Sequence, residues 1–310
     1  MPTNLAAKLA EQLSKALIGK PEVVRLLMTG LFARGHVLIE DLPGLGKTTL
    51  ARALARGISC DFKRVQFTPD LLPTDIIGTS VYRQEGGTFE WRAGPIFTNV
   101  LLADEINRAT PRTQSALLEA MSEQQISAEG ETRKLARPFF VIATQNPIEH
   151  AGTYPLPESQ LDRFMLKFDV GYPSGEDERR ILMEHAAGDT LQGVSQVLTR
   201  EEVLIVQEAA KKVRVEQSIA DYILDIVNET RAHPKLVSGA SPRGSVALFR
   251  AAQAYAMIEG RDFVIPDDVK LLAVPVLSHR IIERASFDRR GGQAGQEIIR
   301  KILNKVAVSA

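Results

Sequence analysis

Three things are scarce in this chain of 310 residues: cysteine, net charge and long apolar runs. Cys60 is the single cysteine, which excludes an internal disulfide and a cysteine-based metal cluster and favours a reducing compartment. The 38 basic and 38 acidic side chains cancel, which argues against a globally basic nucleic-acid binder. No stretch approaches the roughly 18 consecutive apolar residues of a membrane span, and charged residues interrupt the N-terminal segment, so no signal peptide is expected. These absences predict a soluble cytoplasmic protein.

The apolar pattern predicts an α/β domain followed by a helical one. Short strand-like runs are expected at 36–40, 62–67, 99–103, 138–144 and 165–170. Helical periodicity separates several of them, as at 111–123, so we expect a parallel sheet covered on both faces. After residue 175 only helices are expected, at 176–187, 200–212, 217–232, 243–258 and 266–273. The predicted organisation is a nucleotide-binding α/β domain over 1–175 and a smaller all-α domain over 176–310.

Two segments interrupt this α/β alternation and are expected to form hairpins. Residues 79–92 turn around Gly86-Gly87, and residues 125–136 turn around Glu129-Gly130-Glu131. A minimal nucleotide-binding sheet needs neither, so both hairpins are candidates for function. Near the C-terminus, the glycine-bearing stretch 288–296 is expected to be a surface turn.

The strongest motif lies between the first strand and a helix and reads Pro43-Gly44-Leu45-Gly46-Lys47-Thr48-Thr49. A glycine turn there lets backbone N–H groups face a phosphate at the positive end of the helix. Lys47 would reach the β- and γ-phosphates, and the Thr48 hydroxyl would bind Mg²⁺. The phosphate-loop pattern asks for glycine five residues before Gly46, where this chain has Asp41. The motif is therefore incomplete at its first position.

A second motif, Val100-Leu-Leu-Ala-Asp104-Glu105, is an apolar strand that ends in two carboxylates. Asp104 would hold Mg²⁺, and Glu105 would orient and deprotonate the attacking water. Taken alone, two acids at a strand end are as consistent with a solvent-exposed end. In a chain that also carries a phosphate loop, the catalytic interpretation is favoured.

Three further polar residues are candidates, each with an ordinary structural alternative. Asn146 ends a strand and could contact both the lytic water and the γ-phosphate, or simply turn the chain before proline. Arg163 could act on a neighbour's nucleotide as an arginine finger, or form a surface ion pair. Arg243 opens a C-terminal helix and could touch phosphates, or remain a solvated helix start.

In order and content these motifs resemble the AAA+ ATPases, and the longer strings resemble the MoxR family. Those strings are 104–121, 143–149 and 239–243. The resemblance implies that Ile18-Gly19 lies on the adenine side, that 44–48 and 104–105 are Walker A and B, and that Asn146 is sensor 1. It also implies that Arg163 is the arginine finger and Arg243 sensor 2. The two hairpins fall where this family carries inserts, one in helix 2 and one before sensor 1.

The family resemblance implies a ring, usually a hexamer, that binds ATP and Mg²⁺ between protomers. It further implies remodelling of partner proteins, often proteins with von Willebrand factor A domains, and sometimes assistance in metal insertion. Two alternatives stay open. One is a nucleic-acid-directed motor. The basic residues at the second hairpin favour it, and the neighbouring acids disfavour it; these are Arg133, Lys134 and Arg137 against Glu123, Glu129 and Glu131. The other is a nucleotide-gated scaffold without turnover, which the presence of both Glu105 and Arg163 disfavours.

Overall fold

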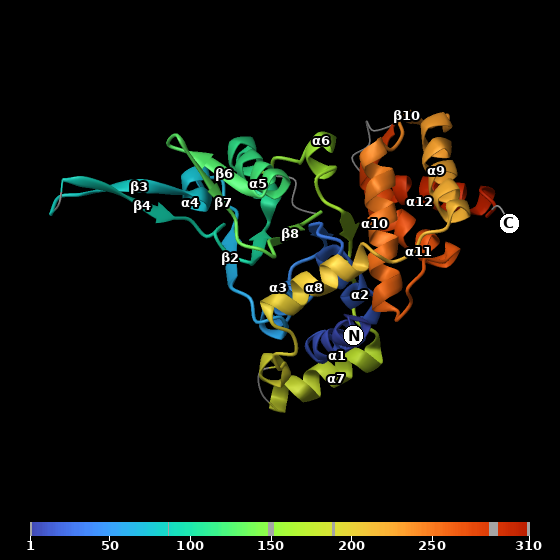
Figure 1. Cartoon of the computed structure of the whole chain (residues 1–310), viewed down its shortest axis with the longest axis horizontal. Coiled ribbons are helices and arrows are strands. Elements are labelled where there is room, and N and C mark those ends of the chain that lie inside the picture. Colours follow the sequence, from blue (N-terminus) through green and yellow to red (C-terminus); the bar gives the residue numbers. More distant parts are fainter. Residues whose placement is uncertain (1, 86, 148–151, 188–189, 285–290, 309–310) are drawn as a thin grey trace.

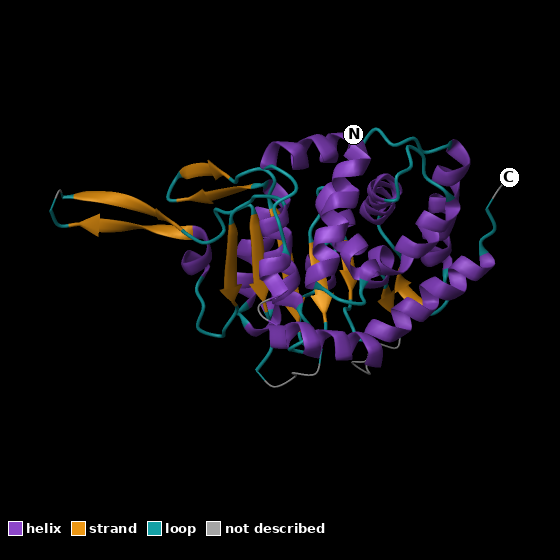
Figure 2. Cartoon of the chain, turned by 90° about the horizontal axis from the view of Figure 1, so that it is seen from below, coloured by secondary structure: helices purple, strands orange, loops and turns teal. Residues whose placement is uncertain are grey.

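The computed structural model describes residues 2–85, 87–147, 152–187, 190–284 and 291–308. Its centre is a five-stranded sheet in the order β2-β5-β8-β1-β9, in which every pairing is parallel. The strands are β1 (Val37–Glu40), β2 (Phe62–Gln66), β5 (Val100–Asp104), β8 (Phe140–Gln145) and β9 (Leu166–Phe168). All five expected strands are present, and helices cover both faces of the sheet (Figures 1 and 2).

Near-continuous apolar strands supply two separate cores, because neighbouring side chains of a strand point to opposite faces. Val37 and Ile39 of β1 belong to one core, whereas Leu38 between them belongs to the other. In β5, Leu102 packs with the first set and Leu101 with the second. The sheet is therefore buried on both sides, which leaves its strand ends as the places where polar side chains can gather.

The described residues up to Leu161 supply six helices around this sheet. They are α1 (Pro2–Ala16), α2 (Pro21–Phe32), α3 (Lys47–Gly57), α4 (Pro73–Ile77), α5 (Pro111–Glu123) and α6 (Glu158–Leu161), with a 3₁₀ turn η1 (Ile106–Arg108). Leu9 and Leu13 of α1 and Leu27 of α2 are fully buried in the core that also contains Val37 and Ile39. Leu117, Leu118 and Met121 of α5 join the core on the opposite face.

Both expected hairpins are present. Strands β3 (Gly78–Arg83) and β4 (Thr88–Ala93) form a long antiparallel arm that extends away from the body (Figures 1 and 2). Strands β6 (Gln125–Ala128) and β7 (Glu131–Lys134) form the second, shorter hairpin. Glu129 and Gly130 both have positive φ, as a two-residue hairpin turn requires. Gly86 of the first expected turn lies outside the described residues.

The C-terminal part is mostly helical, with two departures from expectation. Its elements are α7 (Gly175–Ala187), η2 (Thr190–Gly193), α8 (Arg200–Ala210), α9 (Gln217–Ala232), β10 (Leu236–Ser238), α10 (Pro242–Ile258), α11 (Pro266–Leu277), η3 (Ser278–Arg280), β11 (Ile282–Glu283) and α12 (Gly291–Lys305). We expected no strands here, but β10 and β11 pair antiparallel. They are too short to show strand periodicity, and each depends on a distant partner. The surface turn expected over 288–296 is wrong from Gly291 onward, where α12 begins, and 288–290 lie outside the described residues.

The N-terminal helices do not pack on the sheet alone. Leu27 and Leu31 of α2 share one hydrophobic core with Leu248 and Ala252 of α10. The C-terminal helices are thus anchored to the sheet through α1 and α2 (Figure 1). Within the described part of the chain, no helix has both the length and the apolar character needed to cross a membrane.

Candidate functional site

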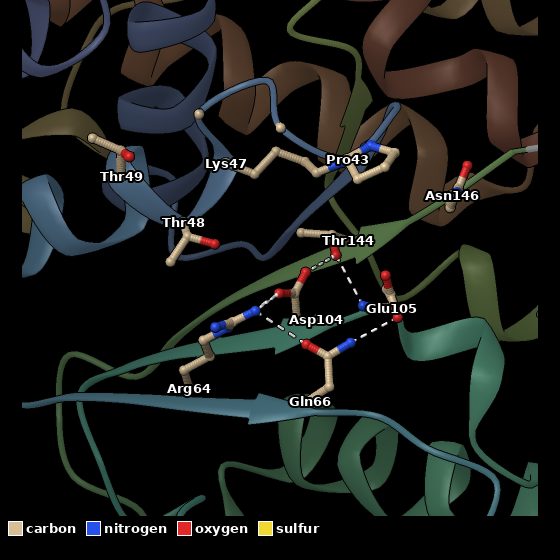
Figure 3. A pocket seen from close by; sticks show the side chains of 12 residues that line it. Pro43, Lys47, Thr48, Thr49, Arg64, Gln66, Asp104, Glu105, Thr144 and Asn146 are labelled. Atoms are coloured by element: carbon tan, nitrogen blue, oxygen red, sulfur yellow. Dashed lines mark hydrogen bonds and ion pairs between the residues drawn. The ribbon is translucent and has the colours of Figure 1, made fainter. Parts of the chain in front are cut away.

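The carboxyl ends of three neighbouring strands bring the main motifs together. In a parallel sheet these ends share one edge, so the phosphate loop after β1, Asp104 at the end of β5 and Asn146 after β8 become neighbours. They surround one cavity of about 330 Å³ (Figure 3). Lys47, Thr48, Thr49 and Glu105 line the same cavity. The structure thus assembles both carboxylates, the lysine and the asparagine around a single space.

The phosphate loop has the backbone geometry of an anion cradle. Gly44 and Gly46 have φ of 87° and 83°, a conformation that other residues rarely adopt. A side chain built on Gly44 would meet no atom within 4 Å, and Gly44 and Gly46 both line the cavity. Gly46 directly precedes α3, whose N–H groups and dipole favour a bound phosphate. The sequence-based interpretation of this turn therefore agrees with its shape.

Lys47 is held inside its own loop. Its Nζ donates to the carbonyl oxygens of Asp41 and Leu42, at 2.6 and 2.8 Å. Burial lowers the pKa of Lys47 from its ordinary value, while the carboxylates of Asp41, Asp104 and Glu105 oppose that shift. The ammonium group of Lys47 binds neutral carbonyl oxygens here. The charged oxygens of a bound triphosphate would be stronger acceptors for it.

The two carboxylates of β5 are fixed by neighbours from adjacent strands. Thr144 Oγ1 donates to Asp104 Oδ1 at 2.5 Å, and Thr144 Oγ1 also accepts the Glu105 N–H at 2.9 Å. Arg64 Nη2 donates to Asp104 Oδ2 at 2.7 Å. Gln66 Nε2 donates to Glu105 Oε2 at 2.7 Å, as Figure 3 shows. These bonds fix where each acid points.

Glu105 stands in a strained backbone position. Its φ is 56°, in the left-handed region that a non-glycine residue seldom occupies, and strain of this kind is typical of functional sites. Besides Gln66, its Oε2 accepts from Arg108 Nη1 at 2.9 Å. Glu105 directly follows the strand and lines the cavity, and a carboxylate in such a place can serve as a general base.

Sequence reasoning missed Arg64, Gln66, Thr144 and Arg108. The first two lie on β2, which becomes the neighbour of β5 only when the sheet forms; Gln66 is then the register partner of Asp104. No local motif contains Arg64 or Gln66, whereas Thr144 and Arg108 lie inside the strings 143–149 and 104–121 without having been assigned a role. For Arg64 and Gln66, their polar character at the end of an otherwise strand-like run was the one available signal.

The donor set fits ATP with Mg²⁺. Mg²⁺ prefers oxygen ligands, commonly one or two from the protein together with phosphate oxygens and water. The Thr48 hydroxyl and the Asp104 carboxylate line the same cavity as the phosphate loop, so both are suited to hold the ion, directly or through water. When bound, the ion would neutralise charge on the transferred phosphoryl group.

A second cavity, of about 800 Å³, adjoins the first and suits the nucleoside. The two cavities share Pro43, Gly44, Gly46 and Thr49. The second is also lined by Ile18, Leu45 and Tyr172, and Ile181 of α7 closes it. Ile18 therefore lies where the adenine-side interpretation places it, and Tyr172 and Ile181 are additional residues that the sequence did not identify. Gly19 lines a neighbouring cavity toward α10–α12 instead and packs closely on Asp177.

Arg163 and Arg243 belong to another part of the surface. Arg163 Nη1 donates to Leu118 O at 2.6 Å and to Ser122 Oγ at 3.0 Å, beside the C-terminal turns of α5. Arg243 is 81% exposed, with Nη1 3.8 Å from Asp162 Oδ2. Neither arginine is among the residues that line the two cavities of its own chain. Arg243 thus lies beside Asp162, the residue next to Arg163, and neither arginine joins the phosphate loop in these cavities.

Known proteins resemble this chain over nearly its whole length. The model for the ATPase family associated with various cellular activities (AAA) matches residues 36–166, and the AAA lid domain matches residues 228–302. An uncharacterized protein of Bacillus subtilis, YeaC, is 48% identical over 98% of this chain and 95% of its own. Chaperone MoxR1 of Mycobacterium tuberculosis is 43% identical over 96% of this chain and 80% of its own. A solved structure from Cytophaga hutchinsonii is 38% identical, with a TM-score of 0.91 over 100% of this chain and 96% of that one. The chain belongs to the MoxR family of AAA+ ATPases.

Proposed function

We propose that this protein hydrolyses ATP with Mg²⁺ in a ring, a hexamer as the family resemblance implies, and uses the turnover to remodel partner proteins in the cytoplasm. The roles are those assigned above: Lys47 and Thr48 hold the phosphates and Mg²⁺ together with Asp104. Glu105 activates water and Asn146 contacts the γ-phosphate. Partners with von Willebrand factor A domains, or partners that receive a metal ion, are the client classes that the family resemblance favours.

One observation carries the ring: among the residues that the structure describes, the site has a carboxylate for the base and a phosphate loop, but its own arginines are already engaged. Arg64 lines the cavity but is bound by Asp104, Arg108 is bound by Glu105, and Arg163 and Arg243 lie outside both cavities. A γ-phosphoryl transfer gains orders of magnitude from an added arginine. An adjoining protomer that presents the surface of Arg163 and Arg243 to this cavity would supply that charge in trans. We therefore propose that both arginines serve the neighbour's nucleotide.

The test is a complementation experiment with two inactive variants. Glu105→Gln lacks the base but keeps its finger, and Arg163→Ala keeps the base but lacks the finger. Each alone should show almost no ATP turnover. In a head-to-tail ring mixed at random from equal amounts, about a quarter of the sites pair an intact base with an intact finger, so turnover should return to about that level.

Concentration dependence provides the second readout. Wild-type turnover per protomer should rise with protein concentration, because only assembled rings contain complete sites. If mixing restores nothing and specific activity stays constant down to dilutions that contain only monomers, then Arg163 does not act in trans. Nucleotide binding without any turnover, even at high concentration, would instead support the nucleotide-gated scaffold.

The proposed coupling to a client follows the chain from Glu105 to the hairpins. Residues 106–139 leave the Glu105 position, build α5 and the β6–β7 hairpin, and return into β8, which ends next to Asn146. A shift at the γ-phosphate can therefore reach this hairpin from both ends. The hairpin in turn contacts the arm: Ser80 N donates to Glu129 Oε1 at 3.0 Å, and the Arg133 guanidinium lies 3.8 Å from the Trp91 ring centroid.

These same contacts weigh against a nucleic-acid motor. Of the basic residues near this hairpin, Arg133 is engaged by Trp91 and by Glu131, whose carboxylate lies 2.5 Å from Nη2. Glu129 at the turn adds a further negative charge. A surface that tracks phosphates needs several free cations, and its binding falls steeply with salt. DNA-stimulated turnover that disappears with added salt is the result that would revive this alternative.

A further inference from the structure

Asp41 occupies the position where the phosphate-loop pattern has glycine, and its side chain is only 8% exposed. Its Oδ2 accepts two successive backbone N–H groups, from Val170 at 2.8 Å and Gly171 at 2.7 Å. Its Oδ1 accepts the N–H of Leu42 at 2.7 Å. Both carboxylate oxygens are thus committed to backbone donors, one to the phosphate loop itself and the other to a distant segment.

The strand register explains why a carboxylate is needed at this point. Strand β1 pairs with β9 up to Ile39 and Phe168, and beyond that pair the two backbones diverge. Asp41 and Val170 are each two residues further on, so the Asp41 side chain spans the gap where the ladder ends. The consecutive N–H groups of Val170 and Gly171 thus point at one acceptor, and the positive φ of Gly171, 67°, turns the chain directly after them. Glycine in place of Asp41 would leave these buried donors without their partner.

The segment that Asp41 holds forms one wall of the nucleoside cavity. Residues 170–173 line that cavity and lead directly into α7, which contributes Ile181 to it. A second bond holds the same segment from the N-terminal side, because Lys20 Nζ donates to Tyr172 O at 2.6 Å. Another wall is the phosphate loop, which starts directly after Leu42, the other partner of Asp41. Asp41 therefore joins the two walls.

We propose that Asp41 is a positioning residue that sets the adenine half of the nucleotide site against its phosphate half. The inference rests on the proposed nucleotide site and explains how that site gains affinity for the adenine part of the nucleotide. Because Asp41 acts through residues 170–173, its loss should weaken ligands that carry adenosine. It should weaken ligands that use the phosphate loop alone much less, because Asp41 reaches that loop with a single side-chain bond, from the Leu42 N–H. This difference separates positioning from a general role in folding the loop.

The test compares two probes, ATP and inorganic tripolyphosphate, both with Mg²⁺. Dissociation constants are measured by competition against a fluorescent adenine nucleotide, with its affinity determined separately for each variant. Asp41→Ala should bind ATP about tenfold more weakly, because the charge-assisted hydrogen bonds that hold residues 170–173 are lost. Its affinity for tripolyphosphate should stay within about twofold of the wild-type value. Lys20→Ala removes only the more exposed hydrogen bond to Tyr172 O. It should also weaken ATP binding selectively, but by a smaller factor.

Matched variants keep the outcome decisive. Asp41→Asn preserves the side-chain volume but cannot accept at both ends, so it should fall between wild type and Asp41→Ala. Asp169→Ala removes an exposed carboxylate one residue before the held segment and should change neither affinity. Equal losses for both probes in folded Asp41→Ala, or no loss for either, would overturn the inference. Failure of wild-type protein to bind either probe would overturn the proposed nucleotide site itself.

Discussion

The nucleotide site and the β3–β4 arm of this molecule differ in how their side chains are held. Every residue of β5 that leads to Asp104 is buried, and Asp104 itself is tied to Thr144 and Arg64 at 2.5 and 2.7 Å. On the arm, Tyr82 and Phe89 are 54% and 74% exposed and pack on each other with ring centroids 5.3 Å apart. The site is built on the core, and the arm extends beyond it.

This difference matches the demands of the two tasks that we propose, phosphoryl transfer at the site and client contact on the arm. Phosphoryl transfer depends on groups held within a fraction of an ångström, which buried parallel strands can provide. A surface that engages clients gains from reach, and a two-stranded ribbon with little buried apolar area has low local stability. The comparison predicts that substitutions at the site change chemistry or folding strongly, whereas those on the arm change neither.

The largest effect is expected from Glu105→Gln. The amide keeps the shape and can still accept from Gln66, but it cannot take a proton from water, so turnover should fall by about 10²–10⁴-fold. ATP affinity should change little, because the phosphate loop is untouched. Steady-state turnover and equilibrium ATP binding measure the two quantities separately. Turnover that survives within a few-fold would mean that another group is the base.

Acid should destabilise the sheet through His36, at the opposite end of the strands from the site. Its Nδ1 accepts the Val141 N–H at 3.0 Å, its Nε2 lies 3.3 Å from Met121 O, and burial lowers its pKa from 6.5 to about 4. Between those values the unfolded chain binds a proton that the folded chain does not. Stability should therefore fall as the pH drops from 6.5 toward 4, by roughly 3 kcal/mol in total.

Urea unfolding at several pH values tests this, with His36→Gln as the matched variant. Glutamine can accept and donate in similar directions without titrating, so the variant should lose less stability on acidification than wild type. His279 is also buried with a lowered pKa and contributes in both proteins, so the difference between the two slopes isolates His36. Identical slopes would show that His36 is not responsible.

The order of helices and strands could be predicted from the sequence because each element has a local pattern of residues. Short apolar runs, helical periodicity and glycine turns gave the five strands, the phosphate loop and both hairpins. What could not be predicted depends on pairing at a distance. Gln66 reaches Glu105 only through the β2–β5 register, and Asp41 finds its partners only beside β9. The same limit hid β10 and β11, whose few residues carry no pattern of their own.

A smaller effect is expected where the two hairpins meet, at the Trp91–Arg133 contact. A cation over an aromatic face at a partly exposed position stabilises by about 0.5–1 kcal/mol. A double-mutant cycle with Trp91→Ala and Arg133→Ala should give a coupling energy of that size in urea unfolding. The exposed Arg83–Glu90 pair on the arm provides the reference, with an expected coupling near zero to about 0.5 kcal/mol. Equal coupling in both cycles would remove the special link between the hairpins.

The smallest effect is expected at the tip of the arm. Phe89→Ala removes a ring that is mostly in solvent, so the free energy of unfolding should change by less than about 0.5 kcal/mol. Phe140→Ala, which removes a ring that is 1% exposed in β8, should cost about 3–5 kcal/mol and serves as the control. Basal ATP turnover of Phe89→Ala should equal wild type. A loss of stability or of basal turnover comparable to that of Phe140→Ala would show that the arm belongs to the structural core of the protein, and the division between rigid site and extended arm would fail.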